Sequence, residues 1–454
     1  MRPRADSRVK DLKVCRLTSN GAGSVYAELI AGRATNMTSA QARTAKVGVL
    51  FVHSATEPPL GADTWVQSQI AGGLDKSRVD VHVACAFGPP DAPTPTFAVM
   101  RPIPGIHLVP IDLGRERSTF TRAARLRTML AAVPAMSSIV RLARYIRRHQ
   151  IAVIHTTDRP RDAAVSVVLA RLGRAKCIIH AHVAFDAGWM SGMLQRAIRR
   201  ADAVIAISEF VGSSVRAAGI DSSRVHVVAN AIDTAAWTPQ LGRDERRAEF
   251  GFSPDDTVIL SVSRLFAAKG PGDLIRSFAL VHEVRPNARL VIVGREVEPG
   301  YAAQLKLLAV DLGVDESVVF TGQRGDVPSL MAAADIYAMP SQFEPFGLVF
   351  LEAMSMQLPI VALDNGGTPE VVEAGTVGLL SPAGDLGSLV DDMLTLIDNP
   401  LLRHQMGQRG RQVAETRFTV ERLARGCEDV YRLLACGTHG RMRGGHGRGK
   451  SPFA

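Results

Sequence analysis

The sequence is poor in cysteine and in long apolar runs. Its five cysteines, Cys15, Cys85, Cys177, Cys427 and Cys436, are scattered over 454 residues, and none belongs to a C-x-x-C pair. This pattern argues against a disulfide framework or a zinc ribbon and favours a reducing compartment. No run of about eighteen apolar residues is present, which excludes a membrane-spanning helix. The basic first residues precede no apolar stretch of signal-peptide length, so we expect a cytoplasmic protein.

Lys and Arg outnumber Asp and Glu, and the distribution of these charges along the chain indicates which partners they favour. The formal net charge is +9, from 53 Lys and Arg against 44 Asp and Glu. Residues 1–46 carry +6 and residues 440–454 carry +4, so the body between them sums to −1. No RNP motif, zinc pattern or aromatic–basic interleaving accompanies these charges, and we therefore predict no nucleic-acid partner.

Residues 115–150 form the basic segment of the body, with nine Arg and Glu116 as the one acid. We predict a helical stretch interrupted near Pro134, with an apolar stripe made of Ile139, Leu142, Ala143 and Ile146. The simpler interpretation is a helix that packs on a sheet and leaves its basic face in water. The alternative is peripheral attachment to an anionic membrane surface.

Short apolar runs alternate with helical patterns in two series. The first series is 47–53, 79–85, 106–111, 151–155, 177–180, 203–207 and 225–228; the second is 258–262, 289–293, 318–320, 336–339, 360–363 and 378–380. Continuous Val, Ile and Leu runs separated by helices indicate buried parallel strands. Two such series predict an α/β protein with two doubly wound, Rossmann-like domains.

The stretch 231–256 breaks this alternation, and we place the domain boundary there. We expect a disordered basic extension at 1–45, a first domain at 46–235, a second at 236–418, a terminal helix at 419–435 and a disordered Gly-rich tail at 436–454. Met37 lies just before the first strand signal, and a true start there is a further expectation. The terminal helix has one apolar face, made of Val420, Leu423, Cys427, Val430 and Leu434.

The sharpest chemical signal is the segment 344–354, E-P-F-G-L-V-F-L-E-A-M, which follows the predicted strand 336–339. Gly347 leaves backbone N–H groups free at a helix N-terminus, and such groups bind anions. Glu344 and Glu352 would repel a phosphate, but carboxylates accept hydrogen bonds from sugar hydroxyls. The segment therefore predicts a sugar-nucleotide site, although the helix dipole alone would also favour an acid at Glu344.

Two further loops follow predicted strands of the second series, at the ends where α/β sheets bind ligands. In S-R-L-F-A-A-K-G, residues 263–270, Arg264 can fork onto a phosphate and Lys269 can supply a point charge. The residue order is not that of a Walker loop. The glycines of D-N-G-G-T-P-E, residues 364–370, permit close backbone approach, and a plain turn explains that segment equally well.

These motifs together resemble glycosyltransferase family 4, a family of retaining enzymes with the GT-B fold. The resemblance rests on Arg264 and Lys269, on the E-x7-E of Glu344 and Glu352, and on G-G-T-P-E, over roughly residues 258–400. The first half is similar more loosely, through A-D-A-V-I-A-I-S at 201–208 and N-A-I-D at 230–233. Ala231 stands where the family usually has Gly, and the family's Gly-Gly near the first strand appears as Gly61-Ala62.

The resemblance implies a role for each matching residue. Arg264 and Lys269 would bind the donor diphosphate, Glu352 the ribose hydroxyls and Glu344 the transferred sugar. Other donor contacts would come from Phe346, Gly347, Leu348 and Gly61, and the crossover of the terminal helix onto the first domain is also implied. His182 matches the family histidine near the reacting carbon, although a lone strand-end histidine is more often structural. The catalytic set would be His182, Glu344, Arg264 and Lys269, and weaker acceptor contacts would come from His155, Asp158 and Arg159 in the same cleft.

The implied reaction moves a hexose from a UDP-, GDP- or ADP-sugar to an acceptor, which is a glycan, a glycolipid or a small molecule of cell-envelope glycan biosynthesis. No D-x-D motif occurs, so no metal or other cofactor is expected, and the two cations would replace the metal. A sugar-nucleotide 2-epimerase shares the fold and stays an alternative. A dinucleotide oxidoreductase is disfavoured because no G-x-G-x-x-G follows the first strand. A catalytically silent, membrane-associated GT-B protein also stays open because of Ala231 and Ala62.

Overall fold

The computed structural model describes residues 46–56, 61–113, 122–186, 188, 190–239 and 242–439, with only the backbone for 122–134 and 437–439. The predicted N-terminal extension, the start at Met37 and the tail beyond 439 lie outside these residues. The same holds for residues 115–121 of the basic segment.

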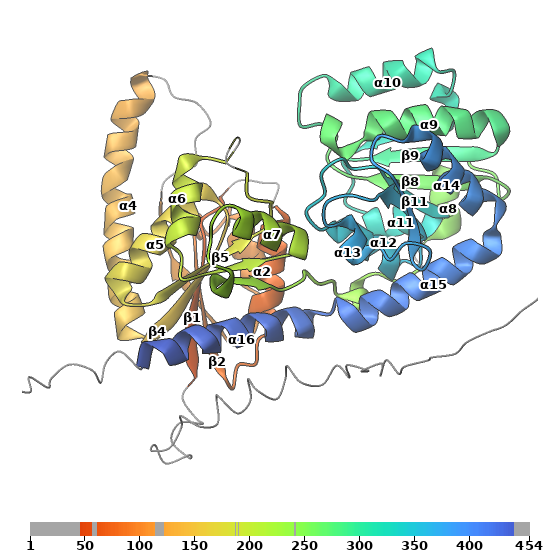
Figure 1. Ribbon diagram of the computed structural model, residues 1–454. Helices are drawn as coiled ribbons and strands as arrows, with labels where there is room; N and C mark the ends of the chain where they lie inside the picture. The colour runs from red at the N-terminus through yellow and green to blue at the C-terminus, as the bar shows by residue number, and fades with distance from the viewer. Residues whose placement is uncertain are drawn as a thin grey trace, which may run out of the picture. The chain divides into compact units, whose positions relative to one another are not determined.

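Two parallel sheets organise the described chain (Figure 1). The first has seven strands in the order β3-β2-β1-β4-β5-β6-β7, and the second has six in the order β10-β9-β8-β11-β12-β13. The strands of the first sheet are β1 (Val47–His53), β2 (Val79–Cys85), β3 (Ile106–Pro110), β4 (Ile151–Thr157), β5 (Lys176–Ala181), β6 (Ala203–Ala206) and β7 (Val225–Val227). Those of the second are β8 (Thr257–Val262), β9 (Ala288–Val293), β10 (Val318–Gly322), β11 (Ile336–Met339), β12 (Ile360–Leu363) and β13 (Gly378–Ser381). The prediction of two doubly wound α/β halves is confirmed.

Helices connect the strands, as parallel pairing requires. The first half contains α2 (Ala62–Gly73), α3 (Pro95–Met100), α4 (Arg122–Arg148), α5 (Pro160–Gly173), α6 (Gly192–Arg200), α7 (Glu209–Ala217) and the short turns η1 (Ser222–Arg224) and η2 (Thr234–Ala236). The prediction that the basic helix is interrupted near Pro134 is wrong, because α4 runs through that position. A proline removes one N–H donor and the other hydrogen bonds continue the helix. Within α4, Leu142, Ala143 and Ile146 are buried in the core.

The second half contains α8 (Arg243–Glu249), η3 (Ala267–Lys269), α9 (Pro271–Val284), α10 (Tyr301–Asp311), η4 (Asp315–Ser317), α11 (Val327–Ala333), α12 (Leu348–Ser355), α13 (Thr368–Val371), α14 (Leu386–Asp398) and α15 (Pro400–Arg417). The predicted domain boundary between residues 235 and 236 falls within η2, and it stays a prediction. No helix among the described residues is long and apolar enough to cross a bilayer.

The last helix, α16 (Val420–His439), returns to the first sheet, where it contacts α2, β4 and β1 (Figure 1). Leu423, Cys427 and Tyr431 are buried in one apolar cluster with Val49 and Phe51 of β1. The predicted crossover helix is therefore confirmed, and its apolar face completes the core of the first half. The predicted end at residue 435 is wrong, because α16 continues to His439 and includes the first four residues of the predicted tail.

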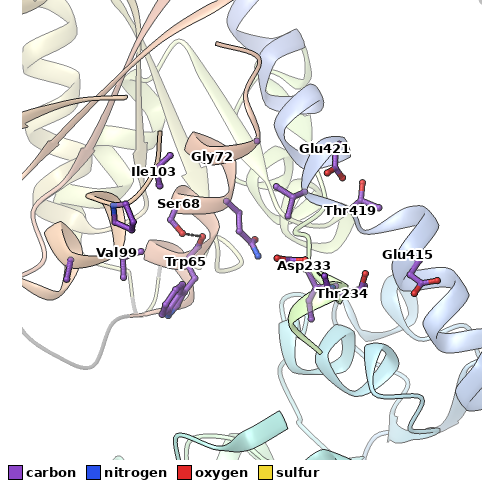
Figure 2. Close-up of a pocket in the computed structure, with 17 residues that line it drawn as sticks. Trp65, Ser68, Gly72, Val99, Ile103, Asp233, Thr234, Glu415, Thr419 and Glu421 are labelled. Carbon is purple, nitrogen blue, oxygen red and sulfur yellow. Dashed lines mark hydrogen bonds between the residues drawn. The ribbon is translucent and has the colours of Figure 1, made fainter. Parts of the chain in front are cut away.

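A cavity of about 1030 Å³ lies beside α2 and the start of α16. Figure 2 shows Trp65 and Ser68 of α2 on one side and Thr419 and Glu421 on the other. Its lining includes Asp233 of the N-A-I-D segment but none of the predicted catalytic, donor-binding or acceptor-binding residues. Size alone therefore does not mark the chemical site of this protein.

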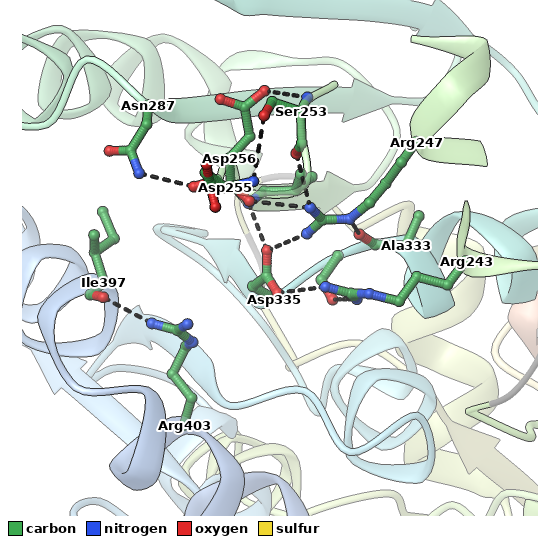
Figure 3. A network of polar contacts seen from close by, with 12 residues as sticks. Arg243, Arg247, Ser253, Asp255, Asp256, Asn287, Ala333, Asp335, Ile397 and Arg403 are labelled. Carbon is green, nitrogen blue, oxygen red and sulfur yellow. Dashed lines mark hydrogen bonds and ion pairs between the residues drawn. The ribbon is translucent and has the colours of Figure 1, made fainter. Parts of the chain in front are cut away.

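A polar network fastens α8 to the second sheet (Figure 3). Arg243 and Arg247 donate to the two carboxylate oxygens of Asp335 at 2.7 and 2.6 Å, and the backbone N–H of Val258 donates to the same carboxylate at 2.8 Å. Arg247 is buried and also donates to the carbonyl oxygen of Asp256 at 3.1 Å. One carboxylate thus joins α8, the start of β8 and the residue that precedes β11.

Candidate active site

A second cavity, of about 850 Å³, contains nearly all of the predicted chemistry. Its lining includes Val262 and Val293, which end β8 and β9. Every predicted site residue except His155 contributes to it: Gly61, Asp158, Arg159, His182, Arg264, Lys269, Glu344, Phe346, Gly347, Leu348 and Glu352. The cavity therefore lies at the carboxyl ends of parallel strands, where α/β sheets bind ligands.

Lys269 and Glu344 form an ion pair within this cavity. The Lys269 Nζ lies 2.5 Å from the Glu344 Oε2, and the two side chains are only 15% and 9% exposed. The backbone that carries Lys269 is fixed by Gly270, whose φ is +71° and where a Cβ would lie 2.1 Å from the Pro340 carbonyl oxygen. Since the pair is largely removed from water, each charge depends on the other for its stability.

The G-G-T-P-E segment supports the loop that carries Glu344. The N–H of Gly367 donates to the Glu344 carbonyl at 2.8 Å. A Cβ on Gly366 would lie 2.5 Å from that carbonyl oxygen, and one on Gly367 would lie 2.2 Å from the Pro345 oxygen. Both glycines are therefore needed for close backbone approach, and the plain-turn interpretation is insufficient.

The last residue of that segment, Glu370, binds the start of α7. Its carboxylate accepts from the backbone N–H groups of Glu209 and Phe210 at 2.6 and 2.7 Å. Ser208, which ends the A-D-A-V-I-A-I-S segment, donates from its hydroxyl to the Pro345 carbonyl at 2.7 Å. Two of the motifs that carry the resemblance are thus bonded to each other.

Helix α12 begins directly after Gly347, and its residue Glu352 lines the cavity. Gly347 has a φ of +88°, and a Cβ there would lie 2.3 Å from the buried Phe350 ring. Burial raises the pKa of Glu352 to about 7. Burial is the sole cause of this shift, and among the described residues no side-chain hydrogen bond to the carboxylate contributes to it, so a ligand hydroxyl would meet an acceptor that is not already engaged.

Positive groups surround the same space. Arg264 is exposed, and its guanidinium lies 5.4 Å from the centre of the Phe266 ring. Arg295 and Arg324 also line the cavity, and the motifs did not identify them. Their position directly after β9 and β10 is the signal that could have found them, since strand ends gather at one edge. Arg324 is already paired with Asp326 and Glu249.

His182 follows β5, and Asp158 holds its backbone. The N–H groups of His182 and Val183 donate to one oxygen of the Asp158 carboxylate at 2.7 and 3.1 Å. The His182 ring stacks on His180 at 4.6 Å between ring centres. Its Nε2 is buried and has no hydrogen-bond partner among the residues that the structure describes.

The first turn of α2 forms another side of the cavity. Arg159 donates from its Nε to the Asp63 carboxylate at 2.5 Å, and both residues line the space with Gly61. Asp63 was not predicted, although an acid in the first turn after β1 is a recognisable signal. Ala231, the departure in N-A-I-D, is buried within the first core, so the sheet tolerates its methyl group.

His155 does not face the cavity, and that prediction is wrong. Strand β4 continues to Thr157, which places its carboxyl end two residues beyond His155. The His155 side chain is fully buried, with Nδ1 2.5 Å from the Tyr431 Oη and Nε2 3.2 Å from the His180 Nδ1. Burial lowers its pKa to about 3. His155 thus joins α16 to the sheet and is not available to an acceptor.

Two family models match the chain, and the boundary between the two matches follows η2. Residues 65–236 match the model described as Glycosyltransferase Family 4, and residues 242–413 match Glycosyl transferases group 1. A GDP-mannose-dependent alpha-(1-6)-phosphatidylinositol monomannoside mannosyltransferase from Mycolicibacterium smegmatis is 30% identical over 320 residues, 67% of this chain and 81% of the relative. The chain belongs to glycosyltransferase family 4. It is therefore a glycosyltransferase, and its relatives support a nucleotide sugar as the donor.

A second relative is similar over a shorter length, and a solved structure is similar over a longer one. The N-acetyl-alpha-D-glucosaminyl L-malate synthase of Bacillus anthracis is 28% identical over 245 residues, which span 53% of this chain and 62% of that enzyme. An Anabaena structure, HepE in complex with UDP and glucose, superposes with a TM-score of 0.69 at 23% identity, over 85% of this chain and all of that one. At that identity the superposition establishes the shared GT-B fold.

Proposed function

We propose that this member of glycosyltransferase family 4 transfers a hexose with retention of configuration and without a metal ion. One observation carries the proposal: a single cavity brings together Lys269, Glu344, Glu352 and the N-terminus of α12. Cations and backbone N–H groups suit a diphosphate, and carboxylates suit hydroxyl groups.

The donor would lie along the carboxyl ends of the second sheet. Arg264, Lys269 and the N–H groups after Gly347 would meet the diphosphate, and Glu352 would accept from the ribose hydroxyls. Glu344 would accept from hydroxyls of the transferred sugar. Because Lys269 already pairs with Glu344, a diphosphate at Lys269 would leave the Glu344 carboxylate available to the sugar.

The contacts of the carboxylates in the cavity support retention of the anomeric configuration. The described lining contains four: Asp63, Asp158, Glu344 and Glu352. Asp63 binds Arg159, Asp158 accepts from two backbone N–H groups and Glu344 binds Lys269. Glu352 is held near its protonated state by burial. None is free to deprotonate an acceptor on the face opposite the leaving group, as inversion requires, because Glu344 would bind the sugar hydroxyls once the diphosphate takes Lys269. The leaving phosphate is then the remaining base, which supports transfer on one face of the sugar.

The transfer can then proceed without a covalent intermediate between the sugar and the enzyme. The bond between the anomeric carbon and the leaving phosphate breaks, a bond to the acceptor oxygen forms, and the acceptor proton passes to that phosphate. The cations stabilise the departing diphosphate, and Lys269 among them is only 15% exposed. His182 would lie near the reacting carbon, with its ring orientation set by His180 and its backbone by Asp158.

Nucleotide preference is the first property to measure. Thermal shifts with UDP, GDP and ADP compare binding to the folded state directly. UDP and GDP take priority, because one relative is named as GDP-mannose-dependent and one solved neighbour holds UDP. Lys269→Ala and Glu352→Gln should lose most of the shift, whereas the exposed controls Lys306→Ala and Glu316→Gln should keep it. Equal shifts in all four variants would contradict the proposal that Lys269 and Glu352 bind the nucleotide.

The reaction itself is tested with the preferred sugar nucleotide. NMR of the product should show the anomeric configuration of the donor, and added Mg²⁺ or Mn²⁺ should not raise the rate. His182→Ala should lower the rate of transfer while nucleotide binding persists. A 2-epimerase would instead convert the nucleotide sugar with no acceptor present, and a silent protein would bind the nucleotide without turnover.

An anionic membrane surface is the proposed location of a lipid acceptor. Exposed Arg141, Arg144 and Arg148 lie on the outward side of α4, opposite the buried Leu142 and Ile146. The mannosyltransferase relative carries phosphatidylinositol in its name, which supports a lipid acceptor here. Sedimentation with vesicles of phosphatidylcholine alone and with added phosphatidylglycerol tests this. Equal binding to both would contradict the proposal.

A further inference from the structure

Three metal-ligating side chains meet at the edge of the first sheet, away from the cavity described above. Asp80 and His82 lie two residues apart on β2, so both point to the same face of the sheet. His107 lies on the edge strand β3, directly opposite His82 in the parallel register. Strand alternation and strand pairing together therefore place one carboxylate and two imidazoles side by side.

The donor atoms of these residues converge. The His82 Nε2 lies 2.9 Å from one oxygen of Asp80, and the His107 Nε2 lies 3.3 Å from the other. All three donor atoms are within 4.8 Å of one another. A tetrahedral zinc ion with ligands at its usual distances needs donors about 3.3 Å apart. Small side-chain adjustments therefore bring the three donors to coordinating positions.

A surrounding shell already orients the buried imidazole. The Tyr145 Oη lies 2.7 Å from the His82 Nδ1, which fixes the ring and directs its Nε2 toward Asp80. The His149 ring stacks on Tyr145 at 4.1 Å between ring centres and covers the same face. Hydrogen bonds of this kind on the second ring nitrogen are typical of metal-bound histidines.

The cluster is also accessible. The His107 side chain is 60% exposed and that of Asp80 is 36% exposed, while His82 is buried. An ion can therefore reach the two outer ligands from solvent, and the buried histidine gives the site a rigid base. A fourth coordination position would face the solvent.

We propose that Asp80, His82 and His107 bind a divalent transition-metal ion of the Zn²⁺ type at the edge of the first sheet. Two imidazole nitrogens and one carboxylate oxygen match the ligand preference of that ion. The bound metal clamps the edge strand β3 to β2. It takes no part in sugar transfer, because none of the three ligands lines the cavity that contains Glu344, and neither Asp80 nor His82 lies beyond the middle residue of β2.

Calorimetric titration of the full, untagged chain with ZnCl₂ after treatment with EDTA tests the site. The wild-type chain should bind one equivalent. Asp80→Asn and His107→Gln should each weaken that binding by about tenfold or more. Both residues are partly or largely exposed, so these variants are expected to fold. His226→Gln is the matched control, since His226 lies on β7 at the other edge of the same sheet and its loss should leave affinity unchanged.

The same variants separate this cluster from the histidines elsewhere in the chain. Zn²⁺ should raise the melting temperature of the wild type and of His226→Gln, and should raise it much less in Asp80→Asn and His107→Gln. Co²⁺ should give the visible absorption of a tetrahedral site in the wild type and in His226→Gln, but not in Asp80→Asn or His107→Gln. Absence of zinc binding in the wild type, or wild-type affinity in both cluster variants, would overturn the proposal.

Discussion

Among single residues, Glu352 combines burial with a proposed role that depends on its charge. Burial raises its pKa from 4.5 to about 7, so the folded chain holds a proton that the unfolded chain loses between those pH values. The free energy of unfolding therefore falls as the pH rises through this window. The carboxylate that serves the ribose in our proposal is also a source of instability at neutral and higher pH.

Replacing Glu352 by Gln removes that titration. We expect Glu352→Gln to have a free energy of unfolding higher than wild type by up to about 3 kcal/mol at pH 8. The difference should shrink toward zero as the pH falls to 4.5, because both states of the wild type are then increasingly protonated. Urea titrations at several pH values measure it, with the exposed Glu316→Gln as control. A difference that does not change with pH would contradict this explanation.

Single residues also show why parts of the site could not be predicted. The motifs located Lys269, Glu344 and Glu352 because the carboxyl ends of parallel strands share one edge. His155 was misplaced because β4 runs two residues further than its apolar run indicates. The pairing of Glu370 with the start of α7, and that of His107 with Asp80, join residues far apart in the sequence. No local pattern contains such pairings.

At the scale of elements, the start of α12 depends on a glycine for two separate reasons. Gly347 needs its positive φ, and it leaves room for the Phe350 ring. We expect Gly347→Ala to lower the free energy of unfolding by roughly 2–4 kcal/mol and to weaken nucleotide binding. Gly313→Ala isolates the backbone contribution, since Gly313 has a φ of +69° and open space around it. That control should lose only about 1–2 kcal/mol. Equal losses in the two variants would exclude a packing effect.

The attachment of α8 gives a second prediction for an element. Asp335→Ala leaves the buried guanidinium of Arg247 without its carboxylate, and removing one partner of a buried pair costs about 3–5 kcal/mol. Chemical denaturation measures this loss, and the exposed Asp391→Ala serves as control. Because the network lies at the amino ends of the strands, nucleotide affinity in native buffer should stay near that of wild type. A loss of nucleotide binding in a folded Asp335→Ala would show that the network also positions the cavity.

The sequence correctly predicted the strands and helices whose apolar pattern fits only one kind of secondary structure. All the predicted strands are present because buried parallel strands are continuously apolar, and the face of α16 follows from its spacing. The continuity of α4 through Pro134 was missed, because the packing of a long helix can compensate for one lost hydrogen bond. Tyr431 was also missed, although its hydroxyl meets His155 within the core.

At the scale of the whole molecule, the first half is incomplete without the end of the chain. A chain that stops at Phe418 would expose the apolar cluster that Leu423, Cys427 and Tyr431 cover, and would lose roughly 5 kcal/mol or more of burial. This is comparable with the total stability of many proteins. We expect that shortened chain to bind a hydrophobic dye and to unfold early in urea. A chain that ends at His439 should match the full chain, and equal stability of all three would contradict the role of α16.

The return of α16 also has a consequence for how the protein is made. During synthesis the strands of the first sheet leave the ribosome early, but the helix that covers Val49 and Phe51 leaves only after the whole second sheet. The nascent chain must carry that open apolar surface while the second half is translated. The first half is therefore exposed to chaperones and to aggregation for much of translation, and its last step of folding must wait for release of the finished chain.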